Sequence, residues 1–154
     1  MARIKLEPPH WVDFATELTI RVTDINYGGH LGHQELIGLL HEARVQYFAH
    51  YDQTETGRDG EPGIIMNDLA INYRSEAFLG ETLQISMAGA EPWRAGFDLY
   101  YTVNAISPDT GTAPRRVAVA KTGLTFFDYN ARKLASLPAA WAARLTRPLQ
   151  DQAV

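Results

Sequence analysis

The chain has 154 residues, 45% of them hydrophobic and 21% charged, which is typical of one globular domain spanning residues 1–154. Its net charge of −4, without a basic run, argues against nucleic acid as a main partner, because phosphate binding needs a concentrated Lys/Arg face. The sequence contains no cysteine, no signal-peptide pattern and no apolar run of the ~18 residues that span a membrane, so we expect a cytoplasmic protein without membrane contact, disulfides or thiolate metal sites.

The first part of the chain is predicted to be an extended segment, a strand and a loop. Residues 1–12 are expected to be extended, because Pro8 and Pro9 disfavour a helix. Phe14–Val22 alternates loosely and is rich in β-branched residues, which predicts a strand. Residues 23–33 are predicted to form a loop because they contain five turn formers, namely Asp24, Asn26, Gly28, Gly29 and Gly32.

From Gln34 to Tyr51 the apolar period becomes helical. No proline interrupts this segment, and Gly38 is its one weak helix former, at a cost of ~1 kcal/mol relative to alanine. Close approach of the helix to a sheet or a ligand would explain that glycine. The apolar residues fall on one stripe of the helix, and they are Leu36, Leu39, Leu40, Ala43, Tyr47 and Phe48.

The second half of the chain is predicted to be β-rich. A polar loop over residues 52–63 precedes four strand-like segments with short, turn-rich separators, which favour antiparallel hairpins. Leu137–Leu145 is predicted to be a short helix that begins at or just after Pro138, and the chain beyond Pro148 is expected to fray. The four strand-like segments are Ile64–Arg74, Glu81–Ala90, Arg94–Ser107 and Arg115–Asp128. The fold class is therefore α+β, an arrangement of a curved antiparallel five-stranded sheet around one long helix.

Asp24 is the leading candidate for a catalytic carboxylate. Aspartate is common in turns and caps, and that explanation needs no function. However, Gly28 and Gly29 let the backbone approach a ligand closely, and the following helix begins with N–H groups that have no intrahelical partner. A carboxylate facing such amides suits acyl transfer, since one group attacks or activates water and the other stabilises the oxyanion.

Two histidines and one glutamate are further candidates. His30 and His33 lie three residues apart before the helix, and one of them could position substrate or water. A metal site is disfavoured, because this spacing lacks a clear third ligand. Glu42 borders the apolar stripe and could act as a base, although a salt-bridged surface position is the more common one for a glutamate on a helix.

Two blocks of the sequence resemble the hotdog-fold acyl-CoA thioesterases of the 4-hydroxybenzoyl-CoA thioesterase type. Residues 24–48, with Asp24, GGH at 28–30 and LLHEARVQYF, resemble the D-x-D-x-x-G-H-V-N-N…FEEAR segment of that family. Residues 71–85, INYRSEAFLGETLQI, resemble its YxxPAxxGDxLxV block, and residues 126–141 its closing strand. Three positions depart from the pattern: Asn26 replaces an acid, Gly32-His33 replaces Asn-Asn, and the usual proline is absent from the stretch Tyr73–Glu76.

The resemblance implies roles for individual residues. Asp24 would be the nucleophile or general base, and the amides near Gly32 and His33 would form the oxyanion hole. His33 falls where some members carry a histidine that assists catalysis, and Glu42 falls on the helix that bears the catalytic carboxylate in some relatives. His30 completes the predicted catalytic group, and the predicted substrate-binding residues are Tyr27, Gly29, Asn67 and Tyr73.

The sequence therefore predicts a hydrolase that cleaves an acyl-CoA or acyl-carrier thioester to a carboxylic acid and a free thiol. The resemblance implies no cofactor, no metal and a homodimer, often a tetramer, with active sites between subunits. Two alternatives remain open: a non-catalytic acyl-CoA binding protein, which the departures at Asn26 and Gly32 motivate, and a hydratase or dehydratase on the same fold.

Overall fold

A computed structural model describes residues 2–146 of the chain, so the predicted fraying beyond Pro148 lies outside the described residues. The main elements follow the predicted order of one strand, one long helix and a series of strands. They are β1 (Phe14–Thr19), a 3-10 turn (Val22–Asp24), α1 (His33–His50), β2 (Gly63–Tyr73), β3 (Thr82–Trp93), β4 (Gly96–Ile106), β5 (Arg115–Asp128), β6 (Lys133–Leu134) and α2 (Ala139–Leu145).

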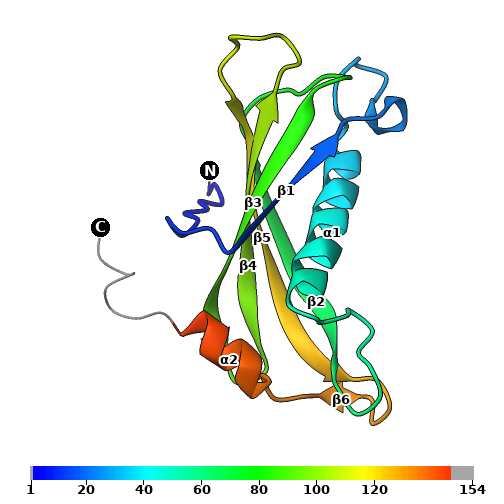
Figure 1. The fold of residues 1–154 in the computed structure, drawn as a ribbon, viewed down its shortest axis with the longest axis vertical. Coiled ribbons are helices and arrows are strands. Elements are labelled where there is room, and N and C mark those ends of the chain that lie inside the picture. Colours follow the sequence, from blue (N-terminus) through cyan, green and yellow to red (C-terminus); the bar gives the residue numbers. More distant parts are fainter. Residues whose placement is uncertain (1, 147–154) are drawn as a thin grey trace.

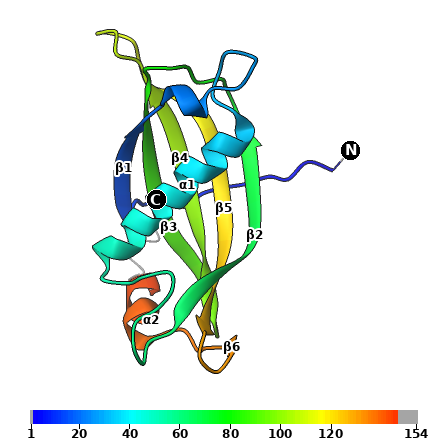
Figure 2. The same ribbon diagram turned by 90° about the vertical axis from the view of Figure 1, so that its right-hand side faces the viewer.

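One antiparallel sheet curves around α1, as Figures 1 and 2 show from two sides, which confirms the predicted hotdog arrangement. The strand order is β1-β3-β4-β5-β2, so the first two strands of the chain form the two edges. The two-residue strand β6 pairs with β5 and adds a short sixth strand to the five that the sequence predicts.

The apolar stripe of α1 forms one side of the core, as predicted. All six stripe residues are buried on the concave face of the sheet, where they meet the inward side chains of β3, β4 and β5. Helix α2 lies at the lower end of the sheet in Figure 1. Its Trp141 is buried in this core, with its ring stacked on that of Phe97 at a centroid distance of 5.3 Å and packed edge-on against Phe48. Burial of each such large side chain stabilises the fold by roughly 1.5–3 kcal/mol.

Two local expectations differ from the structure. The first strand ends at Thr19, because the chain turns into the 3-10 turn at Val22 and the Asp24 side chain bonds back to Arg21. Gly38 is not explained by close approach of α1 to the sheet, since a β-carbon at that position would meet no atom within 4 Å. The residue instead lines an open hollow beside the helix.

Candidate functional site

A cavity of about 380 Å³ lies at the N-terminal end of α1, and we refer to it as the α1-start cavity. Four predicted site residues line it together: His30, Gly32, His33 and Tyr73. Its apolar wall includes Leu31, Leu36, Ala77 and Val117, all of them buried, and its remaining polar lining is Asn26, Arg74, Ser75 and Glu76.

The loop before α1 has a fixed shape because local hydrogen bonds close it. The Gly28 N–H donates to the side-chain oxygen of Asn26 at 2.9 Å, and the Asn26 N–H donates to the His30 carbonyl at 2.9 Å. Gly29 has a φ of +84°, which glycine adopts without the steric cost that a β-carbon brings. The Leu31 N–H then donates to the Ala77 carbonyl at 2.8 Å, which holds the loop against the segment after β2.

The sequence predicts that the backbone amides of Gly32 and His33 form an oxyanion hole, and the structure leaves only one of the two available. The Gly32 N–H donates to the Asp24 carbonyl at 3.0 Å, so the predicted role of Gly32 as an oxyanion donor does not fit this geometry. Gly32 is the N-cap and supplies no side-chain cap. Of the first-turn residues after it, His33 lines the cavity, and its amide has no intrahelical partner at the positive end of the helix dipole.

Asp24 lies on the other side of the helix start, in a hollow of about 510 Å³ that we call the Asp24 hollow. Its side chain is only 4% exposed. Arg21 donates three hydrogen bonds to its carboxylate, from the backbone N at 2.8 Å, from Nε at 3.1 Å and from Nη2 at 3.0 Å. These bonds stabilise the ionised form and lower the pKa of Asp24 below its usual range. Glu35, Gly38 and Glu42 line the same hollow.

His30 and Glu76 meet at the wall of the α1-start cavity. The His30 Nε2 atom lies 3.6 Å from Glu76 Oε1, and its Nδ1 atom lies 3.2 Å from the Leu31 carbonyl oxygen. Tyr73 donates from its hydroxyl to the His33 carbonyl at 3.2 Å, which ties the end of β2 to the first turn of α1. The cavity therefore combines a first-turn amide at His33, an imidazole with a neighbouring carboxylate, and an apolar wall.

Comparison with protein-family models gives one match, the thioesterase-like superfamily, over residues 20–145. The chain belongs to that superfamily. The match spans the loop before α1, the helix α1, the strands β2 to β6 and all of α2, so it includes every predicted site residue. A comparison with curated proteins gives no significant match.

Solved structures of superfamily members share this architecture at low sequence identity. The 4-hydroxybenzoyl-CoA thioesterase from Pseudomonas sp. strain CBS-3 has a TM-score of 0.72 at 19% identity, covering 84% of this chain and 96% of that chain. A 1,4-dihydroxy-2-naphthoyl-CoA thioesterase from Synechocystis gives 0.71 at 18% identity, covering 84% and 93%. A thioesterase superfamily protein from Jannaschia sp. CCS1 gives 0.75 at 15%, covering 88% and 82%. These likenesses show the hotdog fold.

Besides Asp24, four predicted residues lie outside the α1-start cavity of this superfamily member. Tyr27 is fully exposed at the tip of the loop, and Gly29 faces open space. Asn67 occupies a bulge of β2, where its side-chain amide donates to the Thr125 hydroxyl. Glu42 is exposed, as the surface alternative requires, but it accepts its 2.8 Å hydrogen bond from the amide of Gln46 and not from the cation of a salt bridge.

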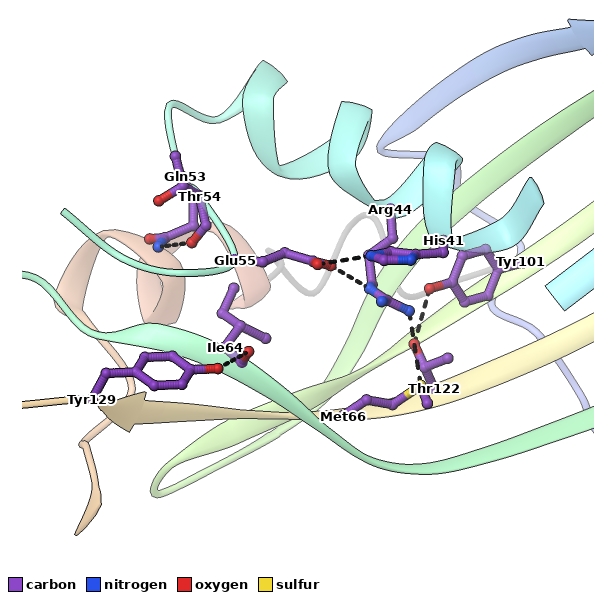
Figure 3. A network of polar contacts seen from close by, with 10 residues as sticks. All are labelled: His41, Arg44, Gln53, Thr54, Glu55, Ile64, Met66, Tyr101, Thr122 and Tyr129. Atoms are coloured by element: carbon purple, nitrogen blue, oxygen red, sulfur yellow. Dashed lines mark hydrogen bonds and ion pairs between the residues drawn. The ribbon is translucent and has the colours of Figure 1, made fainter. Parts of the chain in front are cut away.

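The polar network in Figure 3 was not predicted from the sequence. Arg44 comes from α1, and its side chain is only 11% exposed. It donates from Nε to Glu55 at 2.6 Å, and His41 contacts the same carboxylate at 3.0 Å. Burial opposes ionisation of Glu55, but these two partners outweigh it and lower its pKa. The network ties the loop after α1 to the helix, and the one sequence signal for it was the position of Arg44 beside the apolar stripe.

Within residues 2–146, no three His, Cys, Asp or Glu side chains are grouped as metal ligands. In the same part of the chain, no helix has the length and apolar character that a membrane crossing requires.

Proposed function

We propose that this protein hydrolyses an acyl-CoA-type thioester to a carboxylic acid and a free thiol, with the acyl carbonyl bound in the α1-start cavity. The observation that carries the proposal is the uncapped N-terminus of α1 at the wall of that cavity, in a member of the thioesterase-like superfamily. Water attack on a thioester carbonyl produces an oxyanion, and preorganised backbone amides stabilise such an ion by ~3 kcal/mol per donor.

The substrate class is supported by named members of the superfamily. Two of the similar structures act on 4-hydroxybenzoyl-CoA and 1,4-dihydroxy-2-naphthoyl-CoA. The α1-start cavity has an apolar wall of buried side chains and polar groups around its mouth, which suits an acyl group joined to a polar carrier. We therefore propose coenzyme A as the thiol, with an acyl-carrier protein as the competing donor in the test.

We also propose that the active form is a homodimer, which could assemble further into a tetramer. Strand β2 is an edge of the sheet, 11 residues long, and exposes Met66 and Tyr73. A long edge strand presents unpaired backbone groups that readily pair with another chain. Such pairing would place the mouth of the α1-start cavity, which includes Tyr73, beside a second subunit. The cytoplasmic location stays a prediction.

A panel of acyl-CoA and acyl-carrier thioesters, with detection of the released thiol, tests this function. We expect hydrolysis of at least one aromatic or short-chain acyl-CoA. Tight acyl-CoA binding without turnover of any substrate would instead support the binding protein, and formation of 3-hydroxyacyl-CoA from an enoyl-CoA would support the hydratase. Asp24→Asn belongs in the same panel, because the resemblance assigns the catalytic carboxylate to Asp24 and predicts that this variant loses hydrolysis while keeping its fold.

A further inference from the structure

The groups that could accept a proton inside the α1-start cavity are few. Its titratable and charged lining consists of His30 from the loop, His33 from α1, and Tyr73, Arg74 and Glu76 from the end of β2 and the segment after it. Tyrosine and arginine keep their protons near neutral pH. Asn26, which also lines the cavity, has an amide that cannot act as a base, and Asp24 faces a different hollow. Among the groups that one chain supplies to this cavity, the general base must therefore be His30, His33 or Glu76.

His30 has the orientation of a general base. A backbone carbonyl can only accept a hydrogen bond, so the contact between Nδ1 and the Leu31 oxygen places the ring proton on Nδ1. The neutral ring then keeps an unprotonated Nε2. Gly28 leaves room for that atom, since a β-carbon at position 28 would lie 3.3 Å from it.

Glu76 is placed to assist His30. Its carboxylate oxygen lies 3.6 Å from Nε2, so it stabilises the imidazolium that forms when the ring takes up a proton. Glu76 stands where the family pattern described above has its proline, so this carboxylate is a feature of this chain. By contrast, no hydrogen bond or ion pair within residues 2–146 orients the imidazole of His33. The hydrogen bond from the Tyr73 hydroxyl goes to the backbone carbonyl of His33.

We propose that His30 is the general base of the hydrolysis and that Glu76 is its positioning residue; this inference rests on the proposed function. Water attacks the thioester carbonyl carbon while Nε2 of His30 takes one of its protons. The oxyanion collapses, the carbon–sulfur bond breaks, and the thiolate takes the proton from His30. The products are the carboxylic acid and the thiol, and the base is regenerated.

The test compares His30→Asn, Glu76→Gln and Glu76→Asp with wild type on a substrate that the panel identifies. Asparagine retains a donor near the Nδ1 position, so the bond to Leu31 and the loop shape can persist while Nε2 is lost. We expect kcat to fall roughly 100-fold or more in His30→Asn. Glu76 is 63% exposed, so its loss in Glu76→Gln should lower kcat only roughly fivefold, with KM little changed.

The effect on kcat relative to KM separates this role from a purely structural one. Glu76→Gln should lower kcat while KM is kept, and the conservative variant Glu76→Asp should return kcat towards wild type. His41→Asn is the matched control, because His41 also contacts a glutamate, at 3.0 Å, but lies outside the cavity. We expect wild-type activity from this control.

The outcomes distinguish the two proposals. A wild-type protein that hydrolyses nothing overturns the proposed function, and the role of His30 with it. A wild-type protein that hydrolyses its substrate, with kcat unchanged in Glu76→Gln, overturns only the role of Glu76. Loss of activity in Asp24→Asn with near-wild-type His30→Asn would return the base to Asp24. Circular dichroism on each variant shows whether an inactive protein is still folded.

Discussion

The acidic groups on the two sides of the α1 N-terminus differ in their burial and in their hydrogen-bond and charge partners. On one side, Asp24 is buried and receives three hydrogen bonds from Arg21, which holds it ionised. On the other, Glu76 is largely exposed and its carboxylate lies 3.6 Å from the imidazole of His30. A carboxylate whose lone pairs are already occupied holds a turn together, whereas one beside a titratable ring at a cavity wall can assist proton transfer.

Removing Arg21 should have the largest effect on stability, although its side chain is 68% exposed. In Arg21→Ala the Asp24 carboxylate stays buried and keeps the bond from the backbone N–H of residue 21, but it loses both guanidinium bonds, so we expect the free energy of unfolding to fall. Urea denaturation measures this loss. A free energy of unfolding equal to that of wild type would contradict the view that Asp24 is held by this pair.

Asp24→Asn should cost less, roughly 1.5 kcal/mol, because the amide oxygen can still accept from Arg21 while the charge-assisted part of the bonds is lost. Glu42→Gln is the matched control: this glutamate lines the same hollow but is exposed, and we expect a change within about 0.5 kcal/mol. Equal destabilisation in the two variants would mean that the burial of Asp24 does not determine its contribution to the free energy of unfolding. On the proposal for His30, hydrolysis falls far less in Asp24→Asn than in His30→Asn.

This contrast also shows what could be predicted from the sequence. The stripe from Leu36 to Phe48 was predictable, because helical periodicity is a local property and burial follows from it. The hydrogen bonds between Arg21 and Asp24 could not be predicted, although the two residues are three apart, because the 3-10 turn that brings them together has no recognisable sequence pattern. Glu76 was visible only as a missing proline, since its distance to His30 depends on how two separate loops pack.

The ion pair between Arg21 and Asp24 predicts how the stability of the fold depends on pH. Because Arg21 lowers the pKa of Asp24 in the folded protein, its contribution is fully present above the ordinary aspartate range near 4 and is lost as the pH falls through the lowered value. Thermal unfolding of wild type and Asp24→Asn should therefore differ most near neutral pH, and the difference should shrink as the pH falls below the ordinary aspartate range. A difference that stays constant down to the lowest pH at which both proteins fold would exclude ionised Asp24 as the cause.

The smallest effect is expected from the hydroxyl of Tyr73, which bonds to the His33 carbonyl at the mouth of the α1-start cavity. Tyr73→Phe removes one exposed hydrogen bond, so stability should fall by no more than about 0.5 kcal/mol. If the acyl thioester enters beside this residue, KM rises by a few-fold while kcat is kept. Tyr27→Phe is the control, because Tyr27 is fully exposed and lies outside the cavity. An equal rise in KM in both variants would mean that substrate contacts the loop tip as well, and the two sides of the helix start would no longer be separate in function.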